Sequence, residues 1–259
     1  MITNKNIDNG KPFDWGRASE DYAKYRDIYP KEFYERIVSM GLCTKGQKVL
    51  DIGTGTGVLP RNMYKYGAVF TGADISEKQI EQARRLSEGM NIEYIAAPAE
   101  ELSFPDKSFD TVTACQCFMY FDKSVILPKI HAMIKDNGHF CILFMEWLPE
   151  ESEIAAASER LVLKYNPEWS GAKLKRYKPC MPKEAEEYFV TEDAIGYDIN
   201  VFFTRESWNG RIKACRGIGA SLGSEEIAEF DREHTAYLKT APESFNIPHY
   251  ATILNLRKK

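Results

Sequence analysis

The chain lacks the features that mark several protein classes. None of its apolar runs approaches the roughly 18 residues that a membrane-spanning helix needs. Residues 1–10 are polar and contain no apolar segment of a secretion signal, so we expect a cytoplasmic protein. The net charge is only −4, which argues against nucleic-acid binding through phosphate neutralisation. We therefore expect neither a membrane nor a nucleic-acid partner.

Cysteine and histidine are too few and too scattered to form a metal site or a hydrolytic centre. A chain of 259 residues can bury a core without disulfides, so we expect its six cysteines to be reduced. Cys115 and Cys117 would share a strand face, but no other Cys or His lies at ligand spacing, and we predict no metal. No Ser-His-Asp order or metalloprotease motif accompanies the four histidines, which disfavours a hydrolase.

The most informative segment is Val49–Gly57, which reads Val-Leu-Asp-Ile-Gly-Thr-Gly-Thr-Gly. It resembles the end of a buried strand that enters a turn able to approach a ligand closely. Its glycines are Gly53, Gly55 and Gly57. A dinucleotide fingerprint would place its third glycine at Val58, so a pyrophosphate cradle is disfavoured. Asp51 could accept bonds from turn amides or lie near a cationic ligand, and it would repel phosphate. The segment predicts a nucleoside cofactor with positive charge.

A second acid stands where a nucleoside-binding fold needs one. Residues 68–75 indicate a second strand that ends near Asp74, which is 23 positions after Asp51 (74 − 51). An acid at this place can bond both hydroxyls of a ribose. Ser76 then begins a segment rich in helix-forming residues.

With these motifs in order, the chain resembles the class I S-adenosylmethionine-dependent methyltransferases, whose first motif is an acid, a small or apolar residue and Gly-x-Gly-x-Gly. Residues 97–105 are similar to the family's loop beside adenine, and residues 108–116 to its fourth strand. The resemblance implies S-adenosylmethionine as cofactor and the following contacts with it: Tyr25, Asp51, Gly53, Thr54, Gly55, Gly57, Asp74, Ile75, Gln79, Ala99, Glu100 and Gln116.

Strand and helix patterns alternate up to the fifth strand, which indicates an α/β protein with a parallel sheet. The expected strands are 49–52, 68–75, 92–95, 108–116, 139–145, 197–203 and 250–256. The resemblance implies a Rossmann-like, seven-stranded sheet of order 3-2-1-4-5-7-6, with the last strand antiparallel and helical cap insertions. We expect one methyltransferase domain over residues 1–259. Its parts are an N-terminal lid and helix (1–45), a cofactor-binding core (46–146), a cap insertion (147–195) and C-terminal strands with a helical insertion (196–259).

The residues expected near the acceptor lie in loops at the carboxyl ends of strands and in one later helix. Tyr120 follows the fourth strand, and Glu146 and Trp147 end the fifth. Trp208 and Arg211 lie one turn apart in a segment similar to the Trp-x-x-Arg-x-x-Ser/Thr segment of methyltransferases that resemble trans-aconitate methyltransferases, although a cysteine stands one place beyond the usual hydroxyl. Arg211 could clamp an acceptor carboxylate, or it could be a structural or solvated arginine.

Together these features predict transfer of a methyl group from S-adenosylmethionine to a small-molecule acceptor, with release of S-adenosylhomocysteine. A carboxylate or another anionic metabolite is the favoured acceptor class. A nicotinamide-dependent oxidoreductase and a noncatalytic, cofactor-binding regulatory protein are the alternatives. The residues single out no catalytic base and no oligomeric state.

Overall fold

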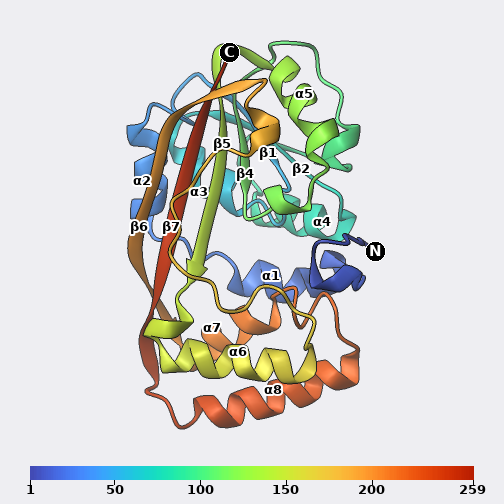
Figure 1. The fold of residues 1–259 in the computed structure, drawn as a ribbon, viewed down its shortest axis with the longest axis vertical. Helices are drawn as coiled ribbons and strands as arrows, with labels where there is room; N and C mark the ends of the chain where they lie inside the picture. Colours follow the sequence, from blue (N-terminus) through green and yellow to red (C-terminus); the bar gives the residue numbers. More distant parts are fainter. The chain divides into compact units, whose positions relative to one another are not determined.

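The computed structural model describes all residues from 1 to 259 and contains a seven-stranded sheet with helices around it (Figure 1). The strands are β1 (Lys48–Ile52), β2 (Val69–Asp74), β3 (Ile92–Ala96), β4 (Phe109–Cys115), β5 (Ile134–Trp147), β6 (Phe189–Thr204) and β7 (Ser244–Lys258). The α-helices are α1 (Ser19–Tyr25), α2 (Lys31–Ser39), α3 (Val58–Met63), α4 (Glu77–Leu86), α5 (Lys123–Met133), α6 (Glu153–Tyr165), α7 (Arg205–Lys213) and α8 (Ser224–Leu238).

The strand order is β3-β2-β1-β4-β5-β7-β6, as the resemblance predicted. The first five strands pair in parallel: β1 with β2 and β4, β2 with β3, and β4 with β5. In these registers Asp51 lies opposite Gly72 on one side and Thr113 on the other. The carboxyl ends of the parallel strands therefore lie side by side, where open α/β sheets bind ligands.

Side-chain contacts show that β7 runs antiparallel to β5. Near the end of β7, the Nζ of Lys258 donates to the carbonyl of Ile134 at the start of β5, at 2.7 Å. Further along, the Nδ1 of His139 and the Oδ1 of Asn255 are 2.9 Å apart. Residue numbers thus rise along one strand as they fall along the other, and Figure 1 shows the C-terminus near the start of β5. The predicted antiparallel last strand is confirmed.

Three strand starts differ by five residues or more from the sequence-based expectation. β5 begins at Ile134 instead of residue 139, β6 at Phe189 instead of residue 197, and β7 at Ser244 instead of residue 250. The first part of β6 therefore lies in the stretch that the sequence assigned to the cap insertion. In contrast, α6 lies wholly within the stretch 147–195.

The chain divides into two compact units. Unit 1 comprises Met1–Ile28, Glu146–Arg176 and Asp198–Tyr250, and unit 2 comprises Tyr29–Met145, Tyr177–Tyr197 and Ala251–Lys259. In unit 2, α5 packs against the sheet through Ile126, Leu127 and Ile130, all fully buried. Burial of each such side chain stabilises the fold by about 1.5–3 kcal/mol. This packing fixes the strand ends that carry the glycine turn.

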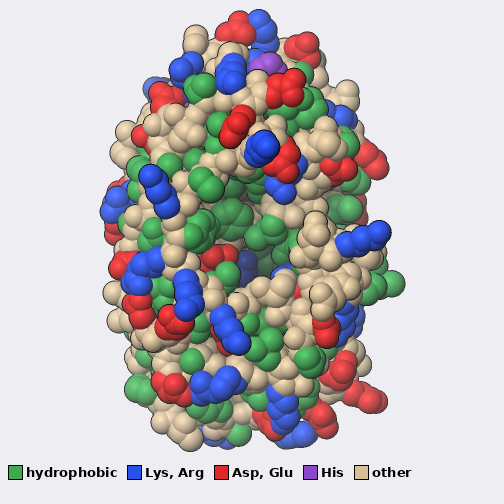
Figure 2. Space-filling model, in the orientation of Figure 1, with side chains coloured by type: hydrophobic (Ala, Val, Ile, Leu, Met, Phe, Trp, Pro, Cys, Tyr) green, Lys and Arg blue, Asp and Glu red, His purple; other side chains and the backbone are tan.

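Unit 1 is mainly helical. In it α7 packs against both α1 and α8, and α8 also packs against α6. Trp208 of α7 and Phe230 of α8 are among its largest fully buried side chains. On the face drawn in Figure 2, Lys and Arg side chains are interspersed with Asp and Glu side chains. The structure contains no helix with the length and apolar character that crossing a membrane requires.

Candidate functional site

The glycine turn after β1 has a backbone that only glycine adopts without strain. Gly53, Gly55 and Gly57 have φ values of +64°, +56° and +72°. The turn also leaves no room for a side chain at Gly53 or Gly57. A Cβ at Gly53 would lie 2.7 Å from the Cys117 Sγ, and one at Gly57 would lie 2.9 Å from the Tyr94 Cζ. All three glycines are therefore favoured by conformation, and Gly53 and Gly57 are also required by packing.

Asp74 ends β2 beside this turn and is held in place by two backbone groups. Its Oδ2 accepts a hydrogen bond from the N–H of Gly55 at 2.9 Å, and its Oδ1 accepts one from the N–H of Ser76 at 2.8 Å. Burial raises the pKa of Asp74, and the two hydrogen bonds oppose that rise. Because a carboxylate can accept about four hydrogen bonds, both oxygens keep acceptor capacity for a ligand. The next residue, Ile75, is apolar and 52% exposed.

Asp51 is 1% exposed and is held by side chains, whereas the sequence suggested turn amides or a cationic ligand as its partners. Its two carboxylate oxygens accept hydrogen bonds from the hydroxyls of Thr54 and Thr113, each at 2.6 Å. Burial raises the pKa of Asp51 to about 6, although both hydroxyls lower it. The carboxylate that accepts a turn amide is that of Asp74. Asp51 instead ties the turn to β4.

Gln116 follows β4 in a left-handed conformation with φ +64°, which is strained for a residue with a Cβ. Its backbone N–H donates to the carbonyl of Leu143 at 2.8 Å, and its Nε2 donates to the carbonyl of Met145 at 2.5 Å. These bonds tie the loop after β4 to the neighbouring strand β5. Such strain is typical of functional sites.

The other predicted cofactor contacts in unit 2 differ in accessibility. Gln79 and Ala99 are buried, in α4 and in a short 3-10 helix (Ala99–Glu101). The side chain of Glu100 accepts a hydrogen bond from the N–H of Asp122 at 3.0 Å. Tyr120, a candidate for the acceptor side, is partly buried and packs against the core of unit 2. Their roles toward a ligand stay predictions.

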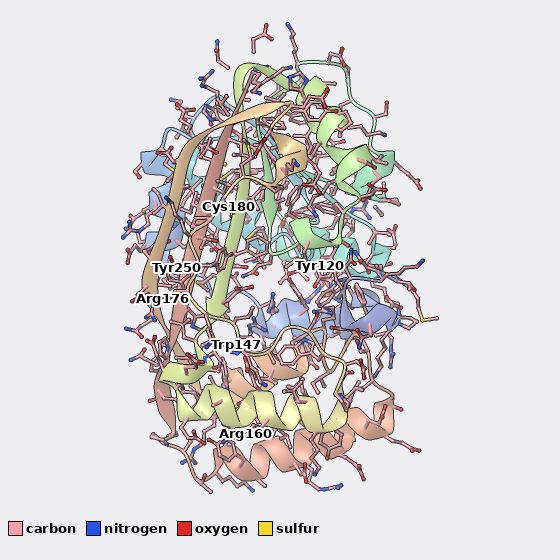
Figure 3. All side chains as sticks on the ribbon, viewed as in Figure 1. Tyr120, Trp147, Arg160, Arg176, Cys180 and Tyr250 are labelled. Carbon is pink, nitrogen blue, oxygen red and sulfur yellow. The ribbon has the colours of Figure 1, made fainter.

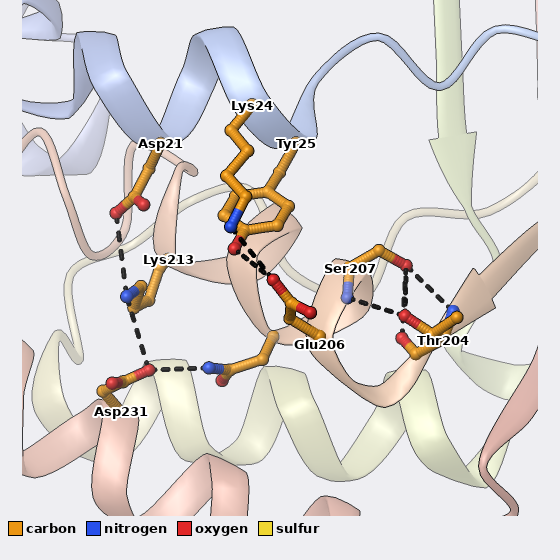
Figure 4. A network of polar contacts seen from close by, with 9 residues as sticks. Asp21, Lys24, Tyr25, Thr204, Glu206, Ser207, Lys213 and Asp231 are labelled. Atoms are coloured by element: carbon orange, nitrogen blue, oxygen red, sulfur yellow. Dashed lines mark hydrogen bonds and ion pairs between the residues drawn. The ribbon is translucent and has the colours of Figure 1, made fainter.

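Tyr25 lies in unit 1, where it packs on α7 (Figure 4). Its hydroxyl donates to the Oε1 of Glu206 at 3.0 Å, and its ring occupies the space that a Cβ at Gly210 would need. The neighbouring Lys24 binds the same carboxylate oxygen at 3.0 Å. The arrangement attaches α1 to α7, and the cofactor contact expected of Tyr25 stays a prediction.

Three predicted acceptor residues, Trp147, Trp208 and Arg211, come together in unit 1. The rings of Trp147 and Trp208 meet edge to face with centroids 5.7 Å apart, and the guanidinium of Arg211 lies over the Trp147 ring, 4.8 Å from its centroid. The indole N–H of Trp147 donates to Glu159 of α6 at 2.7 Å, and Figure 3 shows Trp147 beside this helix. Arg211 is 4% exposed, so it is not a solvated surface arginine.

A second arginine adds positive charge near Arg211. Burial lowers the pKa of His249 to about 3; the hydrogen bond to the Ile247 carbonyl opposes this shift, while the charges of Arg211 and Arg26 add to it. Both arginines also oppose the rise in the pKa of Cys215 that burial causes. The His249 Nε2 is buried and has no hydrogen-bond partner. The charges of Arg211 and Arg26 therefore both act on His249 and on Cys215.

A series of hydrogen bonds holds the indole ring of Trp208 in place. Its indole N–H donates to the Ser158 Oγ at 2.9 Å, which lies 2.9 Å from the Nε2 of His234. The Nδ1 of His234 lies 2.7 Å from the Oδ1 of Asn209, on the same helix as Trp208. Burial lowers the pKa of His234 to about 4, so this ring is neutral at physiological pH. These bonds fix the indole plane.

Glu146 differs from the other acids of the candidate site because its carboxylate has no hydrogen bond or ion pair. It is the penultimate residue of β5 and is partly buried. Burial alone raises the pKa of Glu146 to about 7.

The geometry of unit 2 agrees with the comparisons with known proteins. Residues 50–142, which carry the glycine turn, Asp74 and Gln116, match the family model described as a methyltransferase domain. By this match, residues 50–142 carry a methyltransferase domain.

The chain is similar to two curated enzymes over part of its length. It is 30% identical over 160 residues to the ubiquinone biosynthesis O-methyltransferase of Pseudomonas entomophila. The matched segment covers 59% of this chain and 66% of that relative. The chain is 35% identical over 123 residues to the demethylmenaquinone methyltransferase of Thermotoga maritima. This match covers 46% of this chain and 52% of that relative. The chain thus spans about half to just under two thirds of the curated relatives it matches.

Solved structures extend the likeness of fold. The YcgJ protein of Bacillus subtilis superposes with a TM-score of 0.55, and the match covers 89% of this chain and 99% of YcgJ. The two sequences are 17% identical, so this likeness concerns the fold.

Sequence reasoning missed several residues that build the candidate site. Thr113 holds Asp51, and Tyr94 fills the space under the glycine turn. The missed signal for Thr113 was its place opposite Asp51 in the β1–β4 register. Ser158 and His234 come from helices that are distant in the sequence, and no pattern links them.

Proposed function

We propose that this protein is a methyltransferase that binds S-adenosylmethionine in unit 2 and transfers its methyl group to a small-molecule acceptor, with release of S-adenosylhomocysteine. The observation that carries this proposal is the Asp74 carboxylate, which two backbone N–H groups hold beside the glycine turn. The free acceptor capacity of its two oxygens suits the two hydroxyls of a ribose.

The residues around Asp74 fit the other parts of this cofactor. The exposed side chain of Ile75 offers an apolar surface for a purine ring next to the ribose site. The turn, which has no side chain at its three glycines, allows the backbone to approach the cofactor. The buried acid Asp51, behind the turn, favours a ligand with positive charge.

S-adenosylmethionine supplies a methyl group on a positively charged sulfur, which is a good leaving group. The task left to the protein is to hold the acceptor in line with the methyl group and to exclude water. This requires few catalytic side chains, consistent with the absence of a triad or metal motif from the sequence.

We further propose that unit 1 binds an anionic group of the acceptor through Arg211, with Arg26 nearby. The stack of Arg211 on Trp147 orients its planar guanidinium, which suits two-point binding of a carboxylate. The positive charges of Arg211 and Arg26, which both act on His249 and Cys215, favour an anion there. One relative is named an O-methyltransferase, which supports oxygen as the methylated atom.

A nicotinamide-dependent oxidoreductase fits the turn poorly, because its glycine spacing differs from the dinucleotide pattern. A noncatalytic protein that kept the pocket remains the rival to test. The test is incubation of the protein with radiolabelled S-adenosylmethionine and a dialysable cell extract. Label in a new small molecule, with an equal amount of S-adenosylhomocysteine, supports the proposal. Binding of the cofactor without any transfer would support the noncatalytic rival.

A further inference from the structure

The carboxylate of Glu146 stands apart from every other acid that the proposed function uses. Asp51 is bound by two hydroxyls and Asp74 by two backbone N–H groups, whereas Glu146 makes no hydrogen bond and no ion pair. Its oxygens are not among the buried, unpartnered atoms of the protein, so they remain accessible to a small molecule. A partly buried acid without a partner is costly and suggests a role in function.

The position of Glu146 on its strand is also that of a functional residue. It follows Met145 near the carboxyl end of β5, where parallel sheets present their ligand-binding residues. Because side chains alternate along a strand, Glu146 points to the face opposite Met145 and Trp147, both of which are buried. It is therefore not part of the Trp147 and Trp208 packing.

We propose that Glu146 is the general base of the reaction and that the acceptor atom is a hydroxyl or amine that must lose a proton. The inference rests on the proposed function and names the class of acceptor. Arg211 lies over Trp147, on the other face of β5 from Glu146, so an anionic group bound there would not be the atom that Glu146 deprotonates. A carboxylate acceptor needs no base, so the two acceptor classes give opposite predictions for a variant of Glu146.

The step balances without a further reactant. The O–H or N–H bond of the acceptor breaks, and its proton passes to a carboxylate oxygen of Glu146. The lone pair left on the acceptor forms the new bond to the methyl carbon, and the bond from carbon to sulfur breaks with its electrons on sulfur. Water later removes the proton from Glu146.

The environment of Glu146 suits this exchange. Its raised pKa, about 7, has burial as its only cause, and no charged or titratable neighbour contributes to it. A base whose pKa lies near the working pH is both available to accept a proton and strong enough to remove one.

The test compares the full-length wild type with Glu146→Gln, which cannot accept the proton, and Glu146→Asp, which can. The matched control is Glu150→Gln, which changes an exposed acid paired with Lys175 at 2.6 Å. Each protein is incubated with radiolabelled S-adenosylmethionine and a dialysable cell extract, and the labelled product is treated with mild alkali. Methyl esters release their label as methanol, whereas methyl ethers and methylamines keep it.

We expect an alkali-stable product and a loss of kcat/KM of about 10²–10⁴-fold in Glu146→Gln. Glu146→Asp should recover part of the rate, and the control should match the wild type. The Kd for S-adenosylhomocysteine should be unchanged in all variants. The wild-type rate should rise with pH up to about 7, and this limb should vanish in Glu146→Gln.

An alkali-labile product, or a Glu146→Gln rate equal to that of the wild type, would overturn the inference but leave the proposed methyl transfer intact. A weakened Kd with normal kcat would make Glu146 a cofactor contact and would also overturn it. No labelled product from the wild type would instead remove the proposed function and this inference with it. An NMR titration tests the role of Glu146 without any acceptor. The ¹³C resonance of the Glu146 carboxyl group is identified as the one that is absent from the spectrum of Glu146→Gln, and it should titrate near pH 7. Titration at the ordinary value of about 4.5 would contradict the role.

Discussion

The carboxylate of Asp74 accepts a hydrogen bond from the backbone N–H of Gly55 at 2.9 Å, which joins the end of β2 to the glycine turn after β1. This bond fixes the turn and the proposed ribose site relative to each other. A change in the turn should therefore affect cofactor affinity as well as stability.

Gly57→Ala tests the turn. The substitution places a Cβ on a residue with φ +72° and brings it to 2.9 Å from the Tyr94 Cζ. Backbone strain and overlap together should lower the free energy of unfolding by about 2–4 kcal/mol. The matched control is Gly89→Ala, which has φ +80° but no atom within 4 Å of the new Cβ and should lose only about 1 kcal/mol. Urea denaturation measures both, and equal losses would refute the packing argument.

Arg211→Lys tests the proposed acceptor anchor. Lysine keeps the positive charge but loses the planar group that stacks on Trp147, so two-point binding of an anion is lost. The acceptor KM should rise about 10–100-fold, corresponding to roughly 1–3 kcal/mol, while the Kd for S-adenosylhomocysteine stays unchanged. Steady-state kinetics measure this split. Arg232→Lys, on an exposed ion pair of α8, is the control, and an unchanged KM in Arg211→Lys would reject the anchor.

The two buried histidines of unit 1 should make stability depend on pH. Their folded pKa values, about 4 for His234 and about 3 for His249, lie below the unfolded value of 6.5. Unfolding then takes up protons, so the stability that the neutral rings contribute is complete above pH 6.5 and is lost as pH falls toward 4. Asp51 and Glu146, whose pKa values are raised, act in the opposite direction.

Comparison of a His249 variant with the wild type separates the contribution of this histidine from those of the acids that act in the opposite direction. His249→Phe keeps an aromatic ring beside Phe203, with which His249 now stacks, and removes one titrating group. From pH 6.5 down to about 4, the free energy of unfolding of the variant relative to the wild type should rise by about 1.4 kcal/mol per pH unit. Denaturation at several pH values measures this difference. A difference that does not change with pH would contradict the low pKa of His249.

The central fold was predictable because its signals are local. The apolar run before the glycine turn, the acid that ends β2 and the helix cap at Ser76 each lie within a few residues, and all are present in the structure. The order of the strands came from the resemblance, since no local pattern determines which strands are neighbours.

The missed strand segments have weak local patterns for identifiable reasons. β6 lies at the edge of the sheet, and its first half includes Glu192, Asp193 and Gly196, which do not alternate as a half-buried strand would. β7 contains Pro248, which disfavours a strand assignment. The start of β5 includes Asn137 with φ +61° before Gly138, a sequence typical of a turn.

The partners of the site residues depend on tertiary structure. Asp51 was identified as a key acid, but its bonds to Thr54 and Thr113 depend on the register of β1 with β4. Likewise, Trp208 and Arg211 were paired on one helix by their spacing, whereas the stack of Arg211 on Trp147 joins distant parts of the sequence.

The most direct measurement of the central claim is calorimetric titration of S-adenosylhomocysteine into the wild type, Asp74→Ala and Asp110→Ala. Asp110 is the matched control, because its carboxylate also accepts a backbone N–H from a neighbouring strand, that of Lys48 at 2.8 Å, but at the amino end of β4. We expect binding by the wild type and the control, and a loss of affinity of about 10–100-fold in Asp74→Ala, because hydrogen bonds to a charged group contribute roughly 1.5–3 kcal/mol. No heat with the wild type, or equal affinity in Asp74→Ala, would contradict the account.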